Sequence, residues 1–94
     1  MYSKTYWIGC NPGQAEGLMA HYEGMIQTIK DSEYHVGHHM IQTGENKWLL
    51  VSNYHSKEAA ENAVPMVQDL VKPMMENFGM TLEPIAEGEV VYSY

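Results

Sequence analysis

The amino-acid sequence predicts an α+β domain in which an antiparallel sheet carries two helices on one of its faces. Segments rich in aromatic and β-branched residues alternate with two long amphipathic segments, in the order strand, helix, strand, strand, helix, strand. A turn-forming stretch joins the two middle strands. The chain has 94 residues, which is enough for one domain and no more, so we expect residues 1–94 to form a single domain.

The first half of the chain begins with a strand and a helix. Tyr2–Ile8 is rich in aromatic and β-branched residues and is predicted as a strand, which Asn11-Pro12-Gly13 ends. From Gln14 to Lys30 apolar residues return every three or four positions, which is typical of an amphipathic helix. This stripe consists of Leu18, Tyr22, Met25 and Ile29, with Met19 and Ile26 beside it.

A lane of small residues lies next to this stripe. It consists of Gly17, Gly24 and Thr28, with His21 between them. Two glycines inside a helix cost about 1 kcal/mol each relative to Ala. We therefore expect either close packing or an open space beside them.

Val36–Gln42 and Lys47–Tyr54 are predicted to form a hairpin around the turn at positions 43–46. With a loop of two or four residues, odd positions of the first strand share a face with even positions of the second. One face would then carry His35, Gly37, His39 and Ile41 beside Trp48, Leu50, Ser52 and Tyr54. The other would carry Val36, His38, Met40 and Gln42 beside Leu49, Val51, Asn53 and His55. Both faces are substantially apolar, as in a sheet that is covered on two sides.

Ser56 is a suitable N-cap for a second helix over positions 57–77, which we expect to bend at Pro65 and to end at Gly79. Positions 81–85 contain Pro84, which has no backbone N–H, so this stretch is predicted to be an edge or a bulge. Glu89–Tyr94 is predicted as the last strand.

The composition excludes several functions. The net charge is −7 and the chain contains no Arg, which argues against nucleic acid, phosphate-rich cofactors and acidic membrane surfaces as partners. The single cysteine, Cys10, cannot form an internal disulfide, and no apolar run is long enough to cross a membrane. The 8 Met, 7 Tyr and 2 Trp supply a core that a disordered chain would lack. We expect a soluble, cytoplasmic protein.

The second face of the predicted sheet has no cover within the chain. A folded domain of this size buries only about 60% of its surface, so an isolated copy would be marginally stable. A twofold homodimer that packs two sheets face to face solves both problems.

The order of elements is the ferredoxin-like βαββαβ arrangement. Within it, several short stretches resemble the dimeric α/β-barrel superfamily, and most of all its antibiotic-biosynthesis-monooxygenase-type branch. They are Asn11-Pro12-Gly13, Gly37-His38-His39, Gly44, Trp48-Leu49-Leu50-Val51, Tyr54-His55-Ser56-Lys57-Glu58-Ala59-Ala60 and Gly88-Glu89-Val90-Val91. Together they span nearly the whole chain.

This resemblance implies a dimeric α/β barrel with a pocket between sheet and helices. Family members use such a pocket for cofactor-free oxygenation of aromatic and quinol-like rings, and others degrade haem, isomerise their substrates or have no known reaction. The haem-degrading members use an Asn on the first strand and a Trp and a His on the second helix. The corresponding positions here carry Tyr6, Ala63 and Pro73, which argues against haem breakdown.

The five histidines suggest a metal site, but strand geometry argues against one. His35 and His39 would lie about 13 Å apart on one face, and His38 would point to the other. Only a cross-strand pair such as His38 with His55 could meet, and two ligands are too few for a structural site. We therefore predict no metal and no cofactor, and a haem or metal binder remains the third alternative.

The residues favour a pocket in which a neutral His removes a proton from a phenol or quinol. His39, His21 and Tyr6 are the predicted catalytic residues, and Trp48, Tyr54 and Tyr22 are predicted to hold a flat, uncharged or weakly acidic ring. The competing interpretation is that Tyr and Trp simply fill a core that is short of Leu and Phe. The chain would then be a non-catalytic dimeric domain that binds a small ligand or merely packs.

Overall fold

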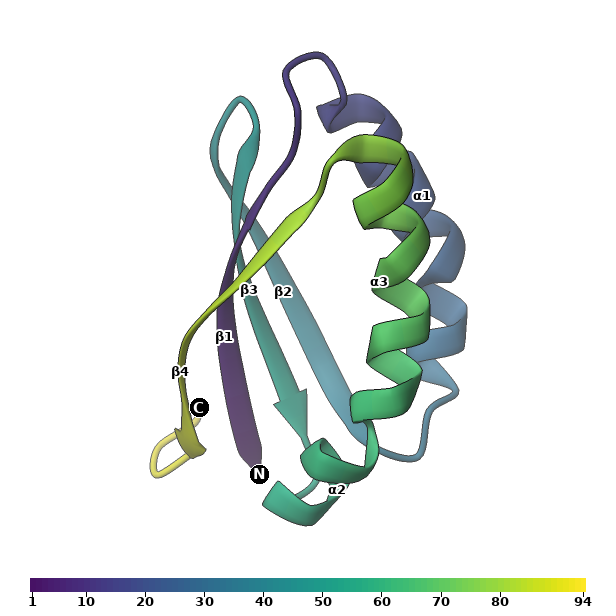
Figure 1. The fold of residues 1–94 in the computed structure, drawn as a ribbon. Helices are drawn as coiled ribbons and strands as arrows, with labels where there is room; N and C mark the ends of the chain where they lie inside the picture. The colour runs from purple at the N-terminus through teal and green to yellow at the C-terminus, as the bar shows by residue number, and fades with distance from the viewer.

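The computed structural model describes residues 1–94 and contains one sheet and three helices (Figure 1). The strands are β1 (Tyr2–Gly9), β2 (His35–Gly44), β3 (Lys47–Tyr54) and β4 (Thr81–Glu89). The helices are α1 (Ala15–Lys30), α2 (Lys57–Asn62) and α3 (Val64–Phe78). The strand order is β2-β3-β1-β4 and all neighbours are antiparallel. This confirms the predicted ferredoxin-like α+β fold.

The two long helices, α1 and α3, contact each other on one face of the sheet, and no helix lies on the opposite face (Figure 1). Side chains alternate along a strand, and in β1 and β3 the even-numbered residues point toward the helices. Trp48 of β3 and Leu18 of α1 are almost completely buried between these layers. The core around them also contains Ile8, Leu50, Met74 and Met80. No helix is long and apolar enough to span a membrane.

The glycines of α1 have two different surroundings. A Cβ atom added at Gly17 would lie 2.9 Å from the ring of Phe78, so this glycine permits α1 and α3 to approach closely. A Cβ atom added at Gly24 would meet nothing within 4 Å. Both of the reasons expected from the sequence therefore occur, one at each position.

Replacing Gly24 by Ala is expected to raise the free energy of unfolding by about 1 kcal/mol, because Ala has less backbone freedom to lose and meets no obstacle there. Urea-induced unfolding followed by circular dichroism measures the change. Gly17→Ala is the matched control, since the same gain is opposed by the contact with Phe78. Equal stabilisation by both substitutions would contradict the packing argument.

The second helical segment is interrupted rather than bent. The sequence predicted one element over positions 57–77, but α2 ends at Asn62 and α3 begins at Val64, with Ala63 as the cap of both. The break comes just before Pro65, which lies in the first turn of α3, where a missing N–H costs no helical hydrogen bond. Both predicted caps are confirmed: Ser56 accepts the Ala59 N–H at 3.0 Å, and Gly79 is left-handed with φ 63°.

The last strand lies earlier than predicted. β4 covers Thr81–Glu89, and Val90–Tyr94 belongs to no regular element. β4 is an edge strand, and its register against β1 shifts so that Ile85 has no partner. The edge and the bulge expected from Pro84 therefore both occur.

The hairpin has a different register from the one expected. Gly44 pairs with Lys47 but Gln42 pairs with Trp48, so Thr43 has no partner. This one-residue bulge moves the side chains at positions 37–42 of β2 to the face opposite the predicted one. The prediction that His39 shares a face with Trp48 is therefore wrong, because His39 pairs with Val51 on the face without helices, and His38 pairs with Ser52 on the helix side.

Candidate functional site

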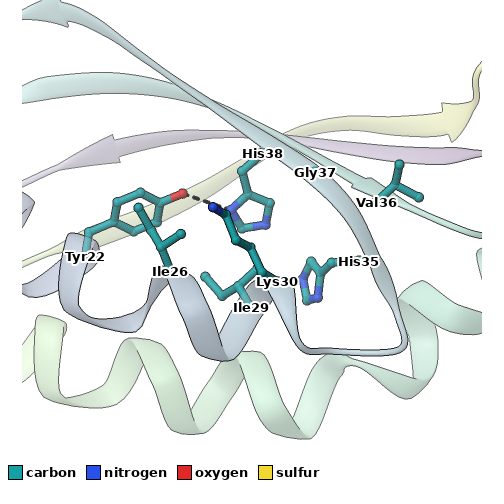
Figure 2. A pocket seen from close by; sticks show the side chains of 8 residues that line it. All are labelled: Tyr22, Ile26, Ile29, Lys30, His35, Val36, Gly37 and His38. Carbon is teal, nitrogen blue, oxygen red and sulfur yellow. Dashed lines mark hydrogen bonds between the residues drawn. The ribbon is translucent and has the colours of Figure 1, made fainter.

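A cavity of about 450 Å³ lies between the second half of α1 and the beginning of β2 (Figure 2). Its walls are formed by Tyr22, Ile26, Ile29, Lys30, His35, Val36, Gly37 and His38. The helix contributes residues that recur every three or four positions, which places them on one side of α1. The cavity therefore combines an apolar wall with the hydroxyl and imidazole groups that a small-molecule site needs for orientation.

A chain of hydrogen bonds runs from this cavity into the core. The Tyr22 hydroxyl lies 3.0 Å from Nδ1 of His38 (Figure 2), and Nε2 of His38 lies 2.7 Å from Oγ of Ser52. Ser52 in turn donates to the Tyr54 hydroxyl at 3.5 Å. Ser52 and Tyr54 are almost inaccessible to solvent. Both ring nitrogens of His38 are thus engaged, which fixes the plane of the imidazole.

The donors and acceptors of this chain follow a single direction. In the tautomer with the proton on Nε2, His38 donates to Ser52 and Ser52 donates to Tyr54. Nδ1 of the neutral ring is then the acceptor for the Tyr22 hydroxyl. A proton delivered at Tyr22 can consequently pass to His38 and onward toward Tyr54.

His35 packs beside this chain. Its Nδ1 lies 3.1 Å from Oγ of Ser32, and its ring centroid lies 5.2 Å from that of His38 and 4.6 Å from that of Tyr54. A second bulge makes this possible, since Val36 has no partner in β3 and His35 and His38 come to the same face. The sequence had placed these two histidines on opposite faces, which is wrong for this reason.

Burial controls the protonation of the site. It lowers the pKa of His38 to about 4, with a smaller contribution from the charge of His35, and it lowers the pKa of His35 as well. Burial also raises the pKa values of Tyr22 and Tyr54. At neutral pH both imidazoles are uncharged and both phenols keep their protons. His38 is therefore available to accept a proton.

The lowered pKa of His38 predicts that the protein loses stability on mild acidification. In the folded chain this pKa is about 4 and in the unfolded chain it is near 6.5, so the unfolded chain binds more protons between these values. The free energy of unfolding has its highest value above about pH 6.5 and falls as the pH approaches 4. Between pH 7 and pH 5 the loss due to His38 is expected to be about 2 kcal/mol.

Urea unfolding at the two pH values measures this loss. His38→Gln should remove the His38 part of it, because glutamine does not titrate. His55→Gln is the matched control, since His55 is exposed beyond the end of β3. If His38→Gln and the unmodified chain lose the same stability, the assignment to His38 is contradicted.

Two further cavities continue the first one between sheet and helices. A narrow apolar cavity of about 50 Å³ shares Tyr22 and His35 with the first. A third cavity, of about 220 Å³, lies next to α3 and shares Tyr6 and Tyr54 with the narrow one. The interior is therefore a row of three adjoining spaces, with the hydrogen-bonded chain at its centre.

Three of the predicted site residues lie along this row. Tyr22 and Tyr54 are the two ends of the hydrogen-bonded chain. Tyr6 lines the narrow cavity and the third cavity, and burial raises its pKa to about 12. The structure thus places one residue from β1, one from α1 and one from β3 along the same row of cavities.

The other three lie elsewhere. Trp48 is packed in the core and lines none of the cavities described above. His21 lies edge to face with Phe78, at 5.8 Å between ring centroids, and His39 is exposed on the opposite face of the sheet. Their predicted roles stay predictions, but the geometry does not join them to the cavity.

The residues that the sequence interpretation missed are His38 and His35. Their position depends on the bulges at Val36 and Thr43, and a bulge leaves no clear mark in the alternation of polar and apolar residues. One signal was present, because Ser52 is a polar residue on the same predicted face of β3 as Trp48 and Leu50, and it needs a partner if that face is buried. No three His, Cys, Asp or Glu side chains are grouped closely enough to hold a metal ion.

Comparisons with known proteins identify the fold. No protein-family profile matches the chain, and no curated protein sequence matches it. A solved candidate antibiotic biosynthesis monooxygenase from Deinococcus radiodurans superimposes with a TM-score of 0.78 at 11% identity, over 100% of this chain and 96% of the other. A dimeric ferredoxin-like protein from an uncultured marine organism gives 0.69 at 11% identity, covering 100% and 98%.

A third similar structure is a variant of MhuD with two manganese protoporphyrin IX molecules bound per active site. It superimposes with a TM-score of 0.67 at 17% identity, over 100% of this chain and 98% of the other. At such identities the likeness is one of fold. The chain therefore has the ferredoxin-like fold that the antibiotic-biosynthesis-monooxygenase-type proteins share, as the resemblance in its sequence predicted.

Proposed function

We propose that this chain is a homodimeric oxidoreductase that resembles the cofactor-independent monooxygenases and acts on a flat aromatic or quinol-like molecule. The observation that carries the proposal is His38, an uncharged base in the wall of a 450 Å³ cavity, hydrogen-bonded to Tyr22 and, through Ser52, to Tyr54. Similar folds include a candidate antibiotic biosynthesis monooxygenase, which supports the same class of reaction.

The proposed reaction begins with removal of a proton from a ring hydroxyl. The substrate hydroxyl donates to the Tyr22 oxygen, the Tyr22 proton moves to Nδ1 of His38, and the proton on Nε2 is shared with Ser52. Burial disfavours a charged His38, but the substrate anion formed beside it favours that charge. Because the anion offsets the cost of burying a charged His38 only while it is bound, His38 takes up the proton only when substrate is present.

The anion is electron-rich and reacts with dioxygen directly. A C–O bond forms between dioxygen and the ring carbon next to the ionised hydroxyl, and the proton taken up by His38 returns to complete a hydroperoxide. The C–H and O–O bonds at that carbon then break, the carbon keeps one oxygen atom, and the second leaves as water. For a naphthohydroquinone the product is the hydroxynaphthoquinone, and the substrate itself supplies all the electrons. No external reductant or cofactor is needed for this balance.

Oxygen uptake with a naphthohydroquinone tests the proposal. We expect consumption well above the spontaneous rate, and mass spectrometry with isotopically labelled dioxygen should show one labelled oxygen atom in the hydroxyquinone. Ile26→Trp, which fills the cavity from α1, should abolish the enzymatic part while the far-UV spectrum is retained. Uptake at the background rate, or formation of the unhydroxylated quinone with peroxide, would contradict a monooxygenase.

The dimer is part of the proposal. The sheet face without helices carries Trp7, Leu49, Val51 and Ile41, which a second copy would cover. One similar structure is described as a dimeric ferredoxin-like protein. Residues 1–94 would then be one half of a dimeric α/β barrel.

Haem is the group that the MhuD likeness suggests, and the residues present do not fit it. Ala63 is completely buried and Pro73 lies within α3, and neither has a group that can ligate iron. Both nitrogens of His38 are hydrogen-bonded, and the His35 ring lies against His38 and Tyr54. A haem titration should therefore produce no Soret band shift, whereas a shifted band would favour the haem-binding alternative.

A further inference from the structure

We infer that the cavity between α1 and β2 selects flat ring compounds that carry a negatively charged group, and that Lys30 is the residue that selects them. This inference takes the site from the proposed function and adds the class of its substrate. It departs from the sequence-based expectation of an uncharged or weakly acidic ligand, because it assigns the ligand a negatively charged group.

The position of Lys30 is the first argument. It is the last residue of α1, and its side chain is one of the eight that line the cavity. Figure 2 shows this side chain running from the end of the helix toward the sheet, in the direction of His38. A ring held in the cavity beside Tyr22 and His38 would therefore have the ammonium group at one of its edges.

The charges of the cavity wall are the second argument. None of the eight lining residues is Asp or Glu, although the chain as a whole has a net charge of −7. Burial keeps His35 and His38 uncharged at neutral pH. Lys30 is thus the one full charge in the wall, and the cavity is a local positive site on an acidic protein. Such a site favours anions and lowers the affinity of cations.

The hydrogen-bonding state of Lys30 is the third argument. The side-chain hydrogen bonds of the structure include none from Lys30, and the neighbouring Asp31 carboxylate accepts from Gln27 instead. The ammonium group is therefore available to a ligand. Lysine in the last turn of a helix also interacts with the helix dipole, which requires no ligand. Binding measurements separate these two roles.

Two fluorescent probes with the same ring skeleton provide the test. Anilinonaphthalene sulfonate carries an anionic group, and N-phenylnaphthylamine lacks it. In the unmodified protein both probes should bind in the cavity, and Ile26→Trp should release both. Lys30→Gln should weaken binding of the sulfonate about tenfold and change binding of the neutral probe less than about twofold. Lys30→Arg should restore the affinity for the sulfonate.

Lys72→Gln is the matched control, because Lys72 is exposed on α3 and lines none of the cavities, and its removal changes the net charge by the same amount. It should leave both affinities unchanged. The inference is overturned if both Lys→Gln variants weaken the sulfonate equally, if Lys30→Gln weakens both probes equally or neither, or if Ile26→Trp releases neither probe.

This test does not depend on turnover. Charge-selective binding without oxygen uptake would leave Lys30 as the selecting residue of a ligand-binding protein and would remove the monooxygenase. Oxygen uptake with unchanged probe selectivity in Lys30→Gln would keep the monooxygenase and remove the role of Lys30.

Discussion

Replacing His38 by Gln is expected to lower kcat for quinol oxygenation by at least about a hundredfold, the usual contribution of a general base. Glutamine can still form hydrogen bonds with Tyr22 and Ser52, but it cannot accept a proton from a phenol. The fold should persist, because the side chain retains polar partners. Initial rates of oxygen uptake, with far-UV circular dichroism on the same samples, measure both effects.

The pH dependence of kcat/KM gives a second readout of the same residue. Since the pKa of free His38 is about 4, kcat/KM should be level from neutral pH down to about pH 5 and should fall as the pH approaches 4. Far-UV circular dichroism at each pH separates this fall from the loss of folded protein that protonation of His38 also causes. Tyr22→Phe keeps the ring but removes the hydroxyl that connects substrate and imidazole, and it should lower kcat with little change in stability.

The double variant His21→Ala with His39→Ala is the control that separates the two site assignments. The sequence named these residues as bases, whereas the structure places one against Phe78 and the other on the face of the sheet that has no helices. We expect this variant to retain turnover. If it abolishes turnover and His38→Gln does not, the assignment of the base to His38 is wrong.

Replacing Val51 by Lys is expected to separate the proposed dimer. Val51 lies on a central strand, between Thr5 and His39, on the face that no helix covers. Two lysines brought together across a twofold axis would each lose hydration without gaining a partner, which costs several kcal/mol per ion. Light scattering should show roughly twice the chain mass of 10.7 kDa for the unmodified protein and the chain mass itself for the variant.

Val51 is preferred to Trp7 for this experiment because the Lys47 ammonium group already lies 4.4 Å from the centre of the Trp7 ring. Thr28→Lys adds the same charge at an exposed position of α1 and should leave the dimer intact. The melting temperature of the unmodified protein should rise with concentration, and that of Val51→Lys should not. A stable unmodified protein with the mass of one chain at micromolar concentration would contradict the dimer.

Local patterns were sufficient to predict the elements of this fold. The apolar spacing around Leu18 and Ile29 marked α1, and the chemistry of Ser56 and Gly79 marked the ends of the second helical segment. These signals are local, because a helix and its caps depend on residues a few positions apart. The last strand was predicted in the wrong place, and it has no such signal, since its end depends on pairing with β1.

The candidate site was less predictable because it depends on register. Tyr22 and Tyr54 were predicted to line a pocket because each belongs to the apolar pattern of its own element, and the structure places both beside cavities. His38 was assigned to the wrong face because Thr43 has no partner in β3. Both faces of this strand are about equally apolar, so hydrophobic alternation cannot choose between them.

The unpaired Thr43 determines which histidine of β2 faces the helices. The observed alignment, in which Thr43 is unpaired, turns His38 toward the helices, whereas the alignment predicted from the sequence, which has no bulge, would turn His39 toward them. Deletion of Thr43 would join Gln42 directly to Gly44, and these two residues could still pair with Trp48 and Lys47. The shortened strand would then keep His38 on the helix side without a bulge. If Thr43 instead took part in the pairing, β2 would shift by one position against β3, and Ser52 would face His39 in place of His38.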